Sequence, residues 1–291
     1  MAQAAVASEI WADRRRRNVE LRARRPFARE VLDFYGALVG VQERAYEDAI
    51  AARPSAPDLV SYVAEMVVPS VVEVSAAAGP ERLRGGVATR LESTDAREIV
   101  ASWIGGEDQP MVDRYIARAS AGPVLEALGS EVAASCIGVR DRLHCPFCGG
   151  APQVSYFAMA GEDLASGGRF LNCARCHASW GYPRMTCAGC GESSTSRLPI
   201  FSEEGTTSGE HGSVVRGLPV GPNGSNGSTP KAIFPHVRIE ACETCRRYLL
   251  NVDLATDPAA VPVVDELDAL PLDLYARERG FTKITPNLMG F

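Results

Sequence analysis

The sequence lacks the marks of a membrane-spanning or an exported protein. Its most apolar stretch, 59–78, is interrupted by two glutamates and a proline, so it does not supply about 20 uninterrupted apolar residues. The N-terminus has no apolar signal-peptide core, and four consecutive arginines lie where that core would stand. We therefore expect a cytoplasmic chain with no membrane insertion.

Recognisable catalytic motifs are missing as well. The sequence has no glycine-rich phosphate loop, no His-Glu-x-x-His pair, no nucleophile elbow and no Ser/His/Asp arrangement, so we expect no enzymatic activity. The 30 basic residues are outnumbered by 36 acidic ones, which gives a net charge of −6. Because nucleic-acid affinity comes largely from basic residues that neutralise phosphates, this balance argues against a nucleic-acid partner.

Cysteine is almost absent from the first half of the chain. One of the nine cysteines, Cys136, lies in the first 140 residues, whereas the other eight lie between residues 145 and 245. The 291 residues suffice for two domains, and this distribution places a boundary near residue 142. In a reducing compartment, paired cysteines are metal ligands or redox groups rather than disulfides.

The segment before this boundary has a helical pattern. From Phe27 to Ala45 apolar residues recur every three or four positions, the period of one buried helix face, and we expect a helix over 26–52. Pro26 suits its first turn, where a missing N–H costs nothing. Similar patterns, separated by Gly and Pro, predict a compact all-α domain over 1–141, with further helices at 58–78, 94–104 and 123–139.

Downstream, apolar runs are too short for helices and are flanked by cysteine pairs. The stretch 202–230 is rich in Gly, Ser, Thr and Asn, and we expect it to be a mobile loop because it has little apolar surface to bury. A final helix is predicted from Pro258 to Arg279, ending at Gly280. The predicted fold is α+β, with a helical domain, two small ribbon modules and a C-terminal helix and tail at 1–141, 142–186, 187–257 and 258–291.

Four Cys-x-x-Cys pairs carry the chemistry of the chain. Two residues between the sulfurs let a tight turn aim both thiolates at one point, and two such turns supply a tetrahedral metal site. Pairing neighbours leaves loops of 24 and 51 residues; the first is close to the usual ribbon spacing and the second is lengthened by the insert. The predicted ligands are Cys145, Cys148, Cys173 and Cys176 for one ion and Cys187, Cys190, Cys242 and Cys245 for the other.

Other interpretations of these pairs remain open. A crossed pairing of the four turns also satisfies tetrahedral geometry, and a four-thiolate site suits either zinc or iron. A thioredoxin-like redox dithiol would need a βαβ setting that the sequence does not indicate. Since a four-cysteine site leaves no open coordination position, we expect each ion to be structural or, at most, a one-electron carrier.

Four consecutive arginines near the N-terminus allow two interpretations. On a helix they point around the whole cylinder, which favours a solvated helix. Alternatively they form a docking surface for an acidic partner. The candidate partner-binding residues are Arg14, Arg15, Arg16 and Arg17.

Three further residues lie near the predicted ligands. Cys136 sits on an apolar helical pattern, and we expect a buried, inert thiol. His144 and His177 each adjoin a ligand cysteine; with eight cysteines available, we expect them beside the metal sites or on the surface rather than as ligands.

The sequence resembles the formate dehydrogenase accessory protein family, FdhE, strongly over about 142–291 and more weakly upstream. The resemblance is carried by Cys145-Pro-Phe-Cys148-Gly149, by Gly168-Arg-Phe-Leu-Asn-Cys173-Ala-Arg-Cys176 with Trp180 and Arg184, by Cys242-Glu-Thr-Cys245, and by Arg279-Gly-Phe with Thr285-Pro-Asn. The arginine-rich stretch 11–25 is similar to the family's first helix.

This resemblance implies a helical N-terminal domain, two rubredoxin-like modules and iron as the metal. It also implies a non-enzymatic role, in which the chain binds the catalytic subunit of formate dehydrogenase in the cytoplasm and assists its maturation. We therefore expect an assembly chaperone with two structural ions. The alternatives are a redox protein that transfers electrons through its iron sites and, against the charge balance, a nucleic-acid-binding zinc ribbon.

Overall fold

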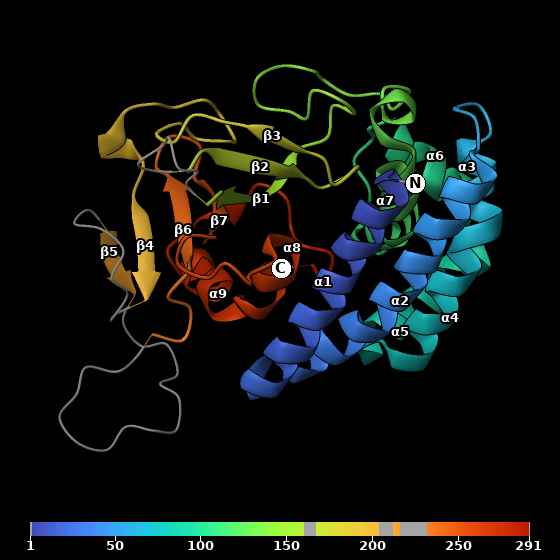
Figure 1. Cartoon of the computed structure of the whole chain (residues 1–291), viewed down its shortest axis with the longest axis horizontal. Helices are drawn as coiled ribbons and strands as arrows, with labels where there is room; N and C mark the ends of the chain where they lie inside the picture. The colour runs from blue at the N-terminus through green and yellow to red at the C-terminus, as the bar shows by residue number, and fades with distance from the viewer. Residues whose placement is uncertain (1, 160–166, 204–211, 216–231, 291) are drawn as a thin grey trace. The chain divides into compact units, whose positions relative to one another are not determined.

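The computed structural model describes residues 2–159, 167–203, 212–215 and 232–290 (Figure 1). These residues fold into two compact units. The first, called here the helical unit, contains residues up to 151 together with 173–178 and 287–290. The second, the sheet unit, contains the described residues of 152–172 and 179–286.

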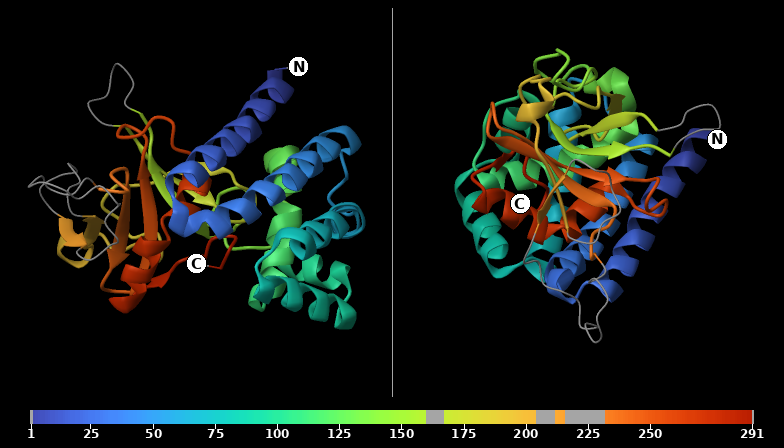
Figure 2. Two further views of the ribbon diagram at one scale, coloured as in Figure 1. Left: turned by 90° about the horizontal axis from the view of Figure 1, so that it is seen from below. Right: turned by 90° about the vertical axis from the view of Figure 1, so that its left-hand side faces the viewer.

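The helical unit is built almost entirely from helices, drawn in blue to green in Figure 2. A single 3-10 turn, Pro26–Ala28, leads into α2, which confirms the helix expected over 26–52. The helices are α1 Ala2–Arg24, α2 Arg29–Ala52, α3 Leu59–Tyr62, α4 Val68–Ala78, α5 Glu81–Ser93, α6 Ala96–Ile104 and α7 Met111–Ala133, with a π-helical turn at Val63–Val67 between α3 and α4.

The stretch from α3 to α4 is the most apolar helix of the described residues. Over Leu59–Ala78 its length and composition would allow a membrane span, with a mean hydropathy of 1.5. Its fully buried positions are Leu59, Val63, Val71 and Ser75, which recur on one side, and α4 packs on α2 and α7. This pattern is that of a core helix in a bundle.

Helix α7 differs from the prediction, which began a helix at Pro123. The helix starts at Met111 and carries Pro123 in its interior. A proline there leaves the carbonyl four residues earlier without its helical N–H. In this protein the buried side chain of Gln42 donates to that carbonyl, the oxygen of Ala119, at 3.1 Å. The proline is therefore tolerated because α2 satisfies the freed acceptor.

The sheet unit contains one sheet in the order β3-β2-β1-β7-β6-β4-β5, with β8 pairing β7 (Figure 1). β1 lies parallel to β7, whereas β6 runs antiparallel to both β7 and β4. The strands are β1 Pro152–Phe157, β2 Arg169–Cys173, β3 Ser179–Gly181, β4 Ile200–Glu203, β5 Gly212–Val215, β6 Val237–Cys242, β7 Arg247–Asp253 and β8 Thr282–Lys283.

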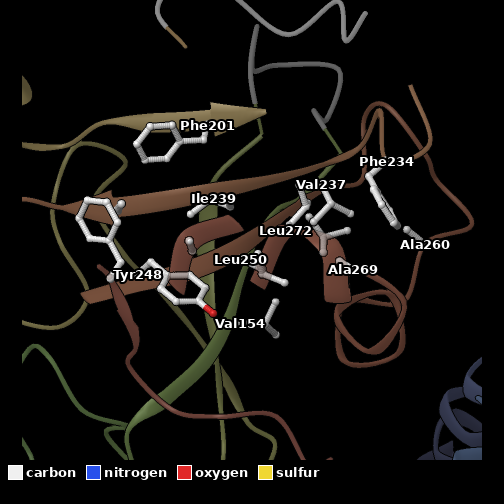
Figure 3. Close-up of a cluster of buried hydrophobic side chains, with 14 residues drawn as sticks. Val154, Phe201, Phe234, Val237, Ile239, Tyr248, Leu250, Ala260, Ala269 and Leu272 are labelled. Atoms are coloured by element: carbon white, nitrogen blue, oxygen red, sulfur yellow. The ribbon is translucent and has the colours of Figure 1, made fainter. Parts of the chain in front are cut away.

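The core of the sheet unit lies between β6, β7 and two C-terminal helices (Figure 3). Alternate residues such as Val237 and Ile239 of β6 and Leu250 of β7 belong to one buried cluster, as a period of two requires. Leu272 joins this cluster from α9. The cluster therefore fixes the two strands on either side of the turn that contains the last cysteine pair.

The single helix predicted from Pro258 to Arg279 is wrong in one respect. The structure has two helices, α8 Pro262–Asp268 and α9 Leu270–Glu278, separated at Ala269. Pro271 stands in the first turn of α9, where its ring is tolerated, but it cannot continue a helix from α8. Gly280 ends the segment with a φ of 77°, as expected.

The predicted α+β fold class, with a helical N-terminal part and ribbon-like modules, is confirmed. The module boundaries at 142, 187 and 258 stay a prediction, and strands from both predicted modules share the sheet. Of the predicted mobile loop at 202–230, two pieces lie in β4 and β5, and the remaining residues lie outside the described part of the chain.

Candidate metal centre

The first group of cysteines lies in the helical unit. Sγ of Cys145 is 3.7 Å from Sγ of Cys176, and Sγ of Cys148 is 3.4 Å from Sγ of Cys173. All four sulfurs lie within 4.8 Å of one another, and all four residues are buried. The structure thus brings together the first two Cys-x-x-Cys pairs.

Each turn of this group is closed by backbone hydrogen bonds. The N–H of Cys145 donates to the oxygen of Gly150 at 2.8 Å, and the N–H of Gly149 donates to the oxygen of Cys145 at 2.9 Å. Gly149 has a φ of 70°, and a side chain there would meet the backbone of Gly138 at 2.6 Å. The glycine after the pair is therefore required by both conformation and space.

The second group lies in the sheet unit and repeats this construction. Sγ of Cys187 is 3.7 Å from Sγ of Cys245, and Sγ of Cys190 is 3.7 Å from Sγ of Cys242. The N–H of Cys187 donates to the oxygen of Glu192 at 2.8 Å, and Gly191 takes a φ of 78°.

The repetition extends to the residue after the later pair of each group. His177 follows Cys176 with a φ of 57°, and Arg246 follows Cys245 with a φ of 56°. Two non-glycine residues in the left-handed region at the same place are uncommon, and they indicate that both groups use one turn geometry.

The sulfur positions fit a tetrahedral ion. Bonds of about 2.3 Å to zinc place the corners of a tetrahedron about 3.8 Å apart, close to the observed 3.4 to 3.7 Å. A disulfide would need about 2.05 Å. Backbone N–H groups of Gly150, Arg175 and Gly189 each donate to a cysteine Sγ at 3.3 Å, as suits thiolates. Each group could hold one ion, and the donor set suits zinc and iron alike.

The first group also shows how protons and metal would compete. Hydrogen bonds from Cys148 and Cys173 lower the pKa of the Cys145 thiol, whereas burial raises the pKa of the Cys173 thiol well above its usual value. Four buried sulfurs cannot all be charged without a compensating cation. Metal binding is therefore coupled to proton release.

Two arginines that sequence analysis did not single out hold the first group in place. Arg175 is buried, and its Nη1 donates to the oxygens of Cys148 and Ile137 at 3.0 and 2.9 Å. Arg118, also buried, donates through Nε to the oxygen of Ala174 at 3.2 Å. The position of Arg175 within a cysteine pair is the only signal of this role that the sequence offers.

Glu126 links the arginine-rich helix to the first group. Arg14 binds both carboxylate oxygens of Glu126, at 2.7 and 2.9 Å, and Nδ1 of His177 lies 2.9 Å from Oε2. Burial alone would raise the pKa of Glu126, but the charges of Arg14 and His177 and their hydrogen bonds lower it to about 2. His177 therefore lies beside the ligand Cys176 and binds Glu126.

The four arginines are not evenly solvated. Arg14 and Arg17 are buried, and Arg17 donates to Glu20 at 2.9 Å. The side chains of Arg15 and Arg16 are 45% and 68% exposed. The interpretation as a fully solvated helix is therefore wrong for two of the four, and a partner contact stays a prediction that Arg15 and Arg16 can carry.

Cys136 and His144, which the sequence placed near the predicted ligands, lie outside both cysteine groups. Cys136 is buried, and burial raises the pKa of its thiol to about 11, partly offset by Arg175. Nδ1 of His144 lies 2.7 Å from a carboxylate oxygen of Asp141. Neither histidine belongs to the cysteine groups, and all nine cysteines are free of disulfides.

One further cluster combines a histidine with two aspartates. His236, Asp257 and Asp265 place ligand atoms within 4.8 Å of one another in the sheet unit. Asp265 accepts from His236 at 2.8 Å and from the N–H of Val261, the N-cap of α8, at 2.7 Å. These contacts fix the start of the helix.

The fold and the two groups define a class of protein: a helical unit and a sheet unit, each with one group of four cysteines that could hold an ion. Two family models match the chain, "FdhE, central domain" over residues 144–184 and "FdhE, C-terminal domain" over residues 225–289. Over these two segments the chain is similar to the FdhE family, and the resemblance inferred from the sequence is confirmed.

Individual relatives agree with this assignment. A "Protein FdhE homolog" of Aquifex aeolicus is 32% identical over 149 residues, which are 51% of this chain and 42% of the relative. One of Pseudomonas aeruginosa is 28% identical over 153 residues, 53% of this chain and 41% of the relative. The alignments thus span about two fifths of these relatives.

A solved structure is similar over most of the chain. The crystal structure of the FdhE protein from Pseudomonas aeruginosa matches with a TM-score of 0.60 and 20% identity, covering 96% of this chain and 95% of that one. At this identity the likeness shows that the two chains share a fold.

Proposed function

We propose that this chain is a non-enzymatic accessory protein that binds the catalytic subunit of formate dehydrogenase in the cytoplasm and assists its maturation. The observation that carries the proposal is the pair of complete four-cysteine groups within a chain that is similar to the FdhE family. The match to the central domain includes all four cysteines of the first group, and the match to the C-terminal domain includes Cys242 and Cys245.

In this proposal the eight cysteines bind two ions that act as structural cross-links. An ion held by four thiolates supplies folding free energy to a small ribbon that has little core of its own. Arg175 and Arg118 bind backbone oxygens beside the first group, so they hold its loops in one conformation. The predicted modules at 142–186 and 187–257 would then present rigid loops to a partner.

The partner surface includes Arg15 and Arg16 in this proposal. Arg15 is paired with Glu43 and Arg16 with Asp13, but both side chains stay exposed and can also reach an acidic segment of the client. Arg14 is buried and paired with Glu126. Charged groups at the edge of an interface act mainly on the association rate and on specificity.

Co-purification tests the proposal. Tagged chain is expected to retain the catalytic subunit of formate dehydrogenase from a cell extract, and deletion of its gene is expected to abolish that enzyme's activity. If the subunit never co-purifies and the enzyme stays active in the deletion strain, the chaperone role is wrong.

A redox role is the second candidate, since Cys190 of the second group is exposed. An iron-loaded chain would then undergo repeated reduction and reoxidation, visible in its thiolate-to-iron absorption. A colourless zinc protein from the native host would rule this role out.

A further inference from the structure

The two cysteine groups differ in their access to solvent. In the first group, Cys145, Cys148 and Cys173 have no exposed surface and Cys176 is 4% exposed. In the second group, Cys190 is exposed and Cys245 is half-buried. An incoming ligand can therefore reach a sulfur of the second group directly.

A hollow on the sheet unit is lined by another cysteine of the second group. It measures about 30 Å³, and its lining includes Cys187, Arg169, Arg184, Arg247 and one carboxylate, that of Glu240. Three guanidinium groups therefore face a single acid.

The positive charge of this hollow is only partly neutralised. Arg169 is paired with Glu240 at 2.5 Å, and Arg184 donates to the backbone oxygen of Gly167. Among the described residues, no carboxylate lies within ion-pair distance of Arg247. The hollow at Cys187 therefore attracts anions. Two carboxylates also lie in the cysteine loops of this group, Glu243, which is paired with Arg246, and Glu192, which accepts from Thr244.

The first group has a larger cavity beside it but a different environment. This cavity, of about 230 Å³, is lined by Cys176 and by apolar residues such as Leu125 and Phe147. Besides Cys176, its ionisable lining residues are His177 and Glu126, and the carboxylate of Glu126 is paired with the buried Arg14. An anionic ligand gains no attraction there, and Cys176 stays nearly covered.

From this asymmetry we infer that the second four-cysteine group is an exchange site, which takes its ion from, or passes it to, an anionic thiol-bearing carrier, whereas the first group keeps its ion permanently. Cys190 is the ligand that is replaced first. The inference rests on the metal binding proposed above and is independent of client binding.

The exchange step needs no oxidant or reductant. With an ion bound by the four cysteines, Cys190 Sγ would be the ligand that gives up its place to the incoming sulfur. The proton that the incoming thiol loses passes to Cys190, so charge balances and no oxidation state changes. Arg247 attracts the carrier and takes no part in bond making.

The test measures ion release from the fully loaded native chain under anaerobic conditions, with a chromophoric chelator as the readout. Two thiols serve as attacking ligands: glutathione, which carries net negative charge, and cysteamine, which carries net positive charge. Cysteines that become free are alkylated with iodoacetamide and located by peptide mass spectrometry.

One equivalent of ion is expected to leave in a separate, faster phase, with Cys187, Cys190, Cys242 and Cys245 alkylated before the cysteines of the first group. Arg247→Gln is expected to slow the glutathione reaction about fourfold, the effect of one unit charge about 5 Å away in water, and to speed the reaction of the cationic cysteamine by a similar factor. Arg279→Gln, which removes a charge outside the hollow, should alter neither rate.

Release of both ions at one rate, earlier alkylation of the first group, or retention of both ions would overturn the inference. Equal slowing of the two thiols in Arg247→Gln would show that the arginine acts on the fold and not on the carrier. If the chain co-purifies with its client yet fails this test, the exchange inference is wrong and the accessory role stands.

Discussion

The replacement Glu126→Gln tests the ion-pair network beneath the first cysteine group. The folded protein lowers the pKa of Glu126 from 4.5 to about 2. Because one pKa unit corresponds to about 1.4 kcal/mol, the charged carboxylate contributes about 3 kcal/mol to the free energy of unfolding. Part of this contribution is the ion pair with Arg14, whose buried guanidinium the replacement leaves without its carboxylate.

The pH dependence has a definite sign. Since the folded pKa lies below the unfolded value, the contribution of Glu126 is fully present above pH 4.5 and is lost as the pH falls towards about 2. The stability difference between the wild-type chain and Glu126→Gln is therefore expected to shrink over that interval. Both proteins lose metal in acid, so the comparison removes that common effect.

The assay is urea unfolding followed by circular dichroism at pH 7, on metal-loaded protein, for Glu126→Gln, Arg14→Met and the double variant. Each single change is expected to cost about 3 kcal/mol of unfolding free energy. The double variant should cost clearly less than the sum of the two, because the ion pair between Arg14 and Glu126 can be lost only once. A loss below about 1 kcal/mol for Glu126→Gln, or strict additivity, would refute the reasoning.

Three further changes test separate parts of the molecule. Cys148→Ser is expected to remove one ion per chain and to unfold the first ribbon, measured by elemental analysis and thermal unfolding. Reversing Arg15 and Arg16 to glutamate is expected to weaken binding to the formate dehydrogenase subunit about tenfold, measured by titration calorimetry. Gly129→Ala is expected to cost about 1–3 kcal/mol of stability in urea, because a φ of 69° with a ψ of −162° suits glycine alone.

Matched variants control these changes. Cys136→Ser, outside both groups, should keep both ions. Reversal of Arg22 and Arg24, exposed on the same helix, should affect client binding less. Gly85→Ala, in helix α5 with open space around it, should stabilise by about 0.4–1 kcal/mol. Full metal content in the serine variant, unchanged client affinity, or a stabilised Gly129→Ala would contradict the respective prediction.

Local patterns in the sequence were sufficient to predict the cysteine turns and the long helix α2. A spacing of two residues defines a ligand turn wherever it occurs, and Gly149 and Gly191 mark the positive φ that such turns need. The period of apolar residues defined the helix over 26–52 because one face of it is buried along its whole length.

Features that depend on distant residues were not predictable in this way. The burial of Arg14 follows from Glu126, which lies 112 positions away. The position of Pro123 inside helix α7 depends on Gln42, whose side-chain amide donates a hydrogen bond to the oxygen of Ala119. No local sequence pattern predicts this hydrogen bond. The parallel pairing of β1 with β7 likewise joins segments about 95 residues apart, as in Ser155 with Asn251.

The difference in solvent exposure between the two cysteine groups could not be predicted from the sequence either. Their motifs are alike, and their turns share hydrogen bonds and left-handed residues. What separates them is their surroundings: the first lies among buried residues of the helical unit, and the second includes the exposed Cys190. Solvent exposure depends on how the whole unit folds, so a Cys-x-x-Cys motif alone does not predict it.

X-ray absorption at the metal edge, combined with ion counting on anaerobically purified chain, tests most directly whether these cysteines bind two ions. The result expected is two ions per chain, each with four sulfur neighbours at about 2.3 Å. Nitrogen or oxygen in that shell, fewer than two ions, or cysteines joined as disulfides in the native protein would contradict it.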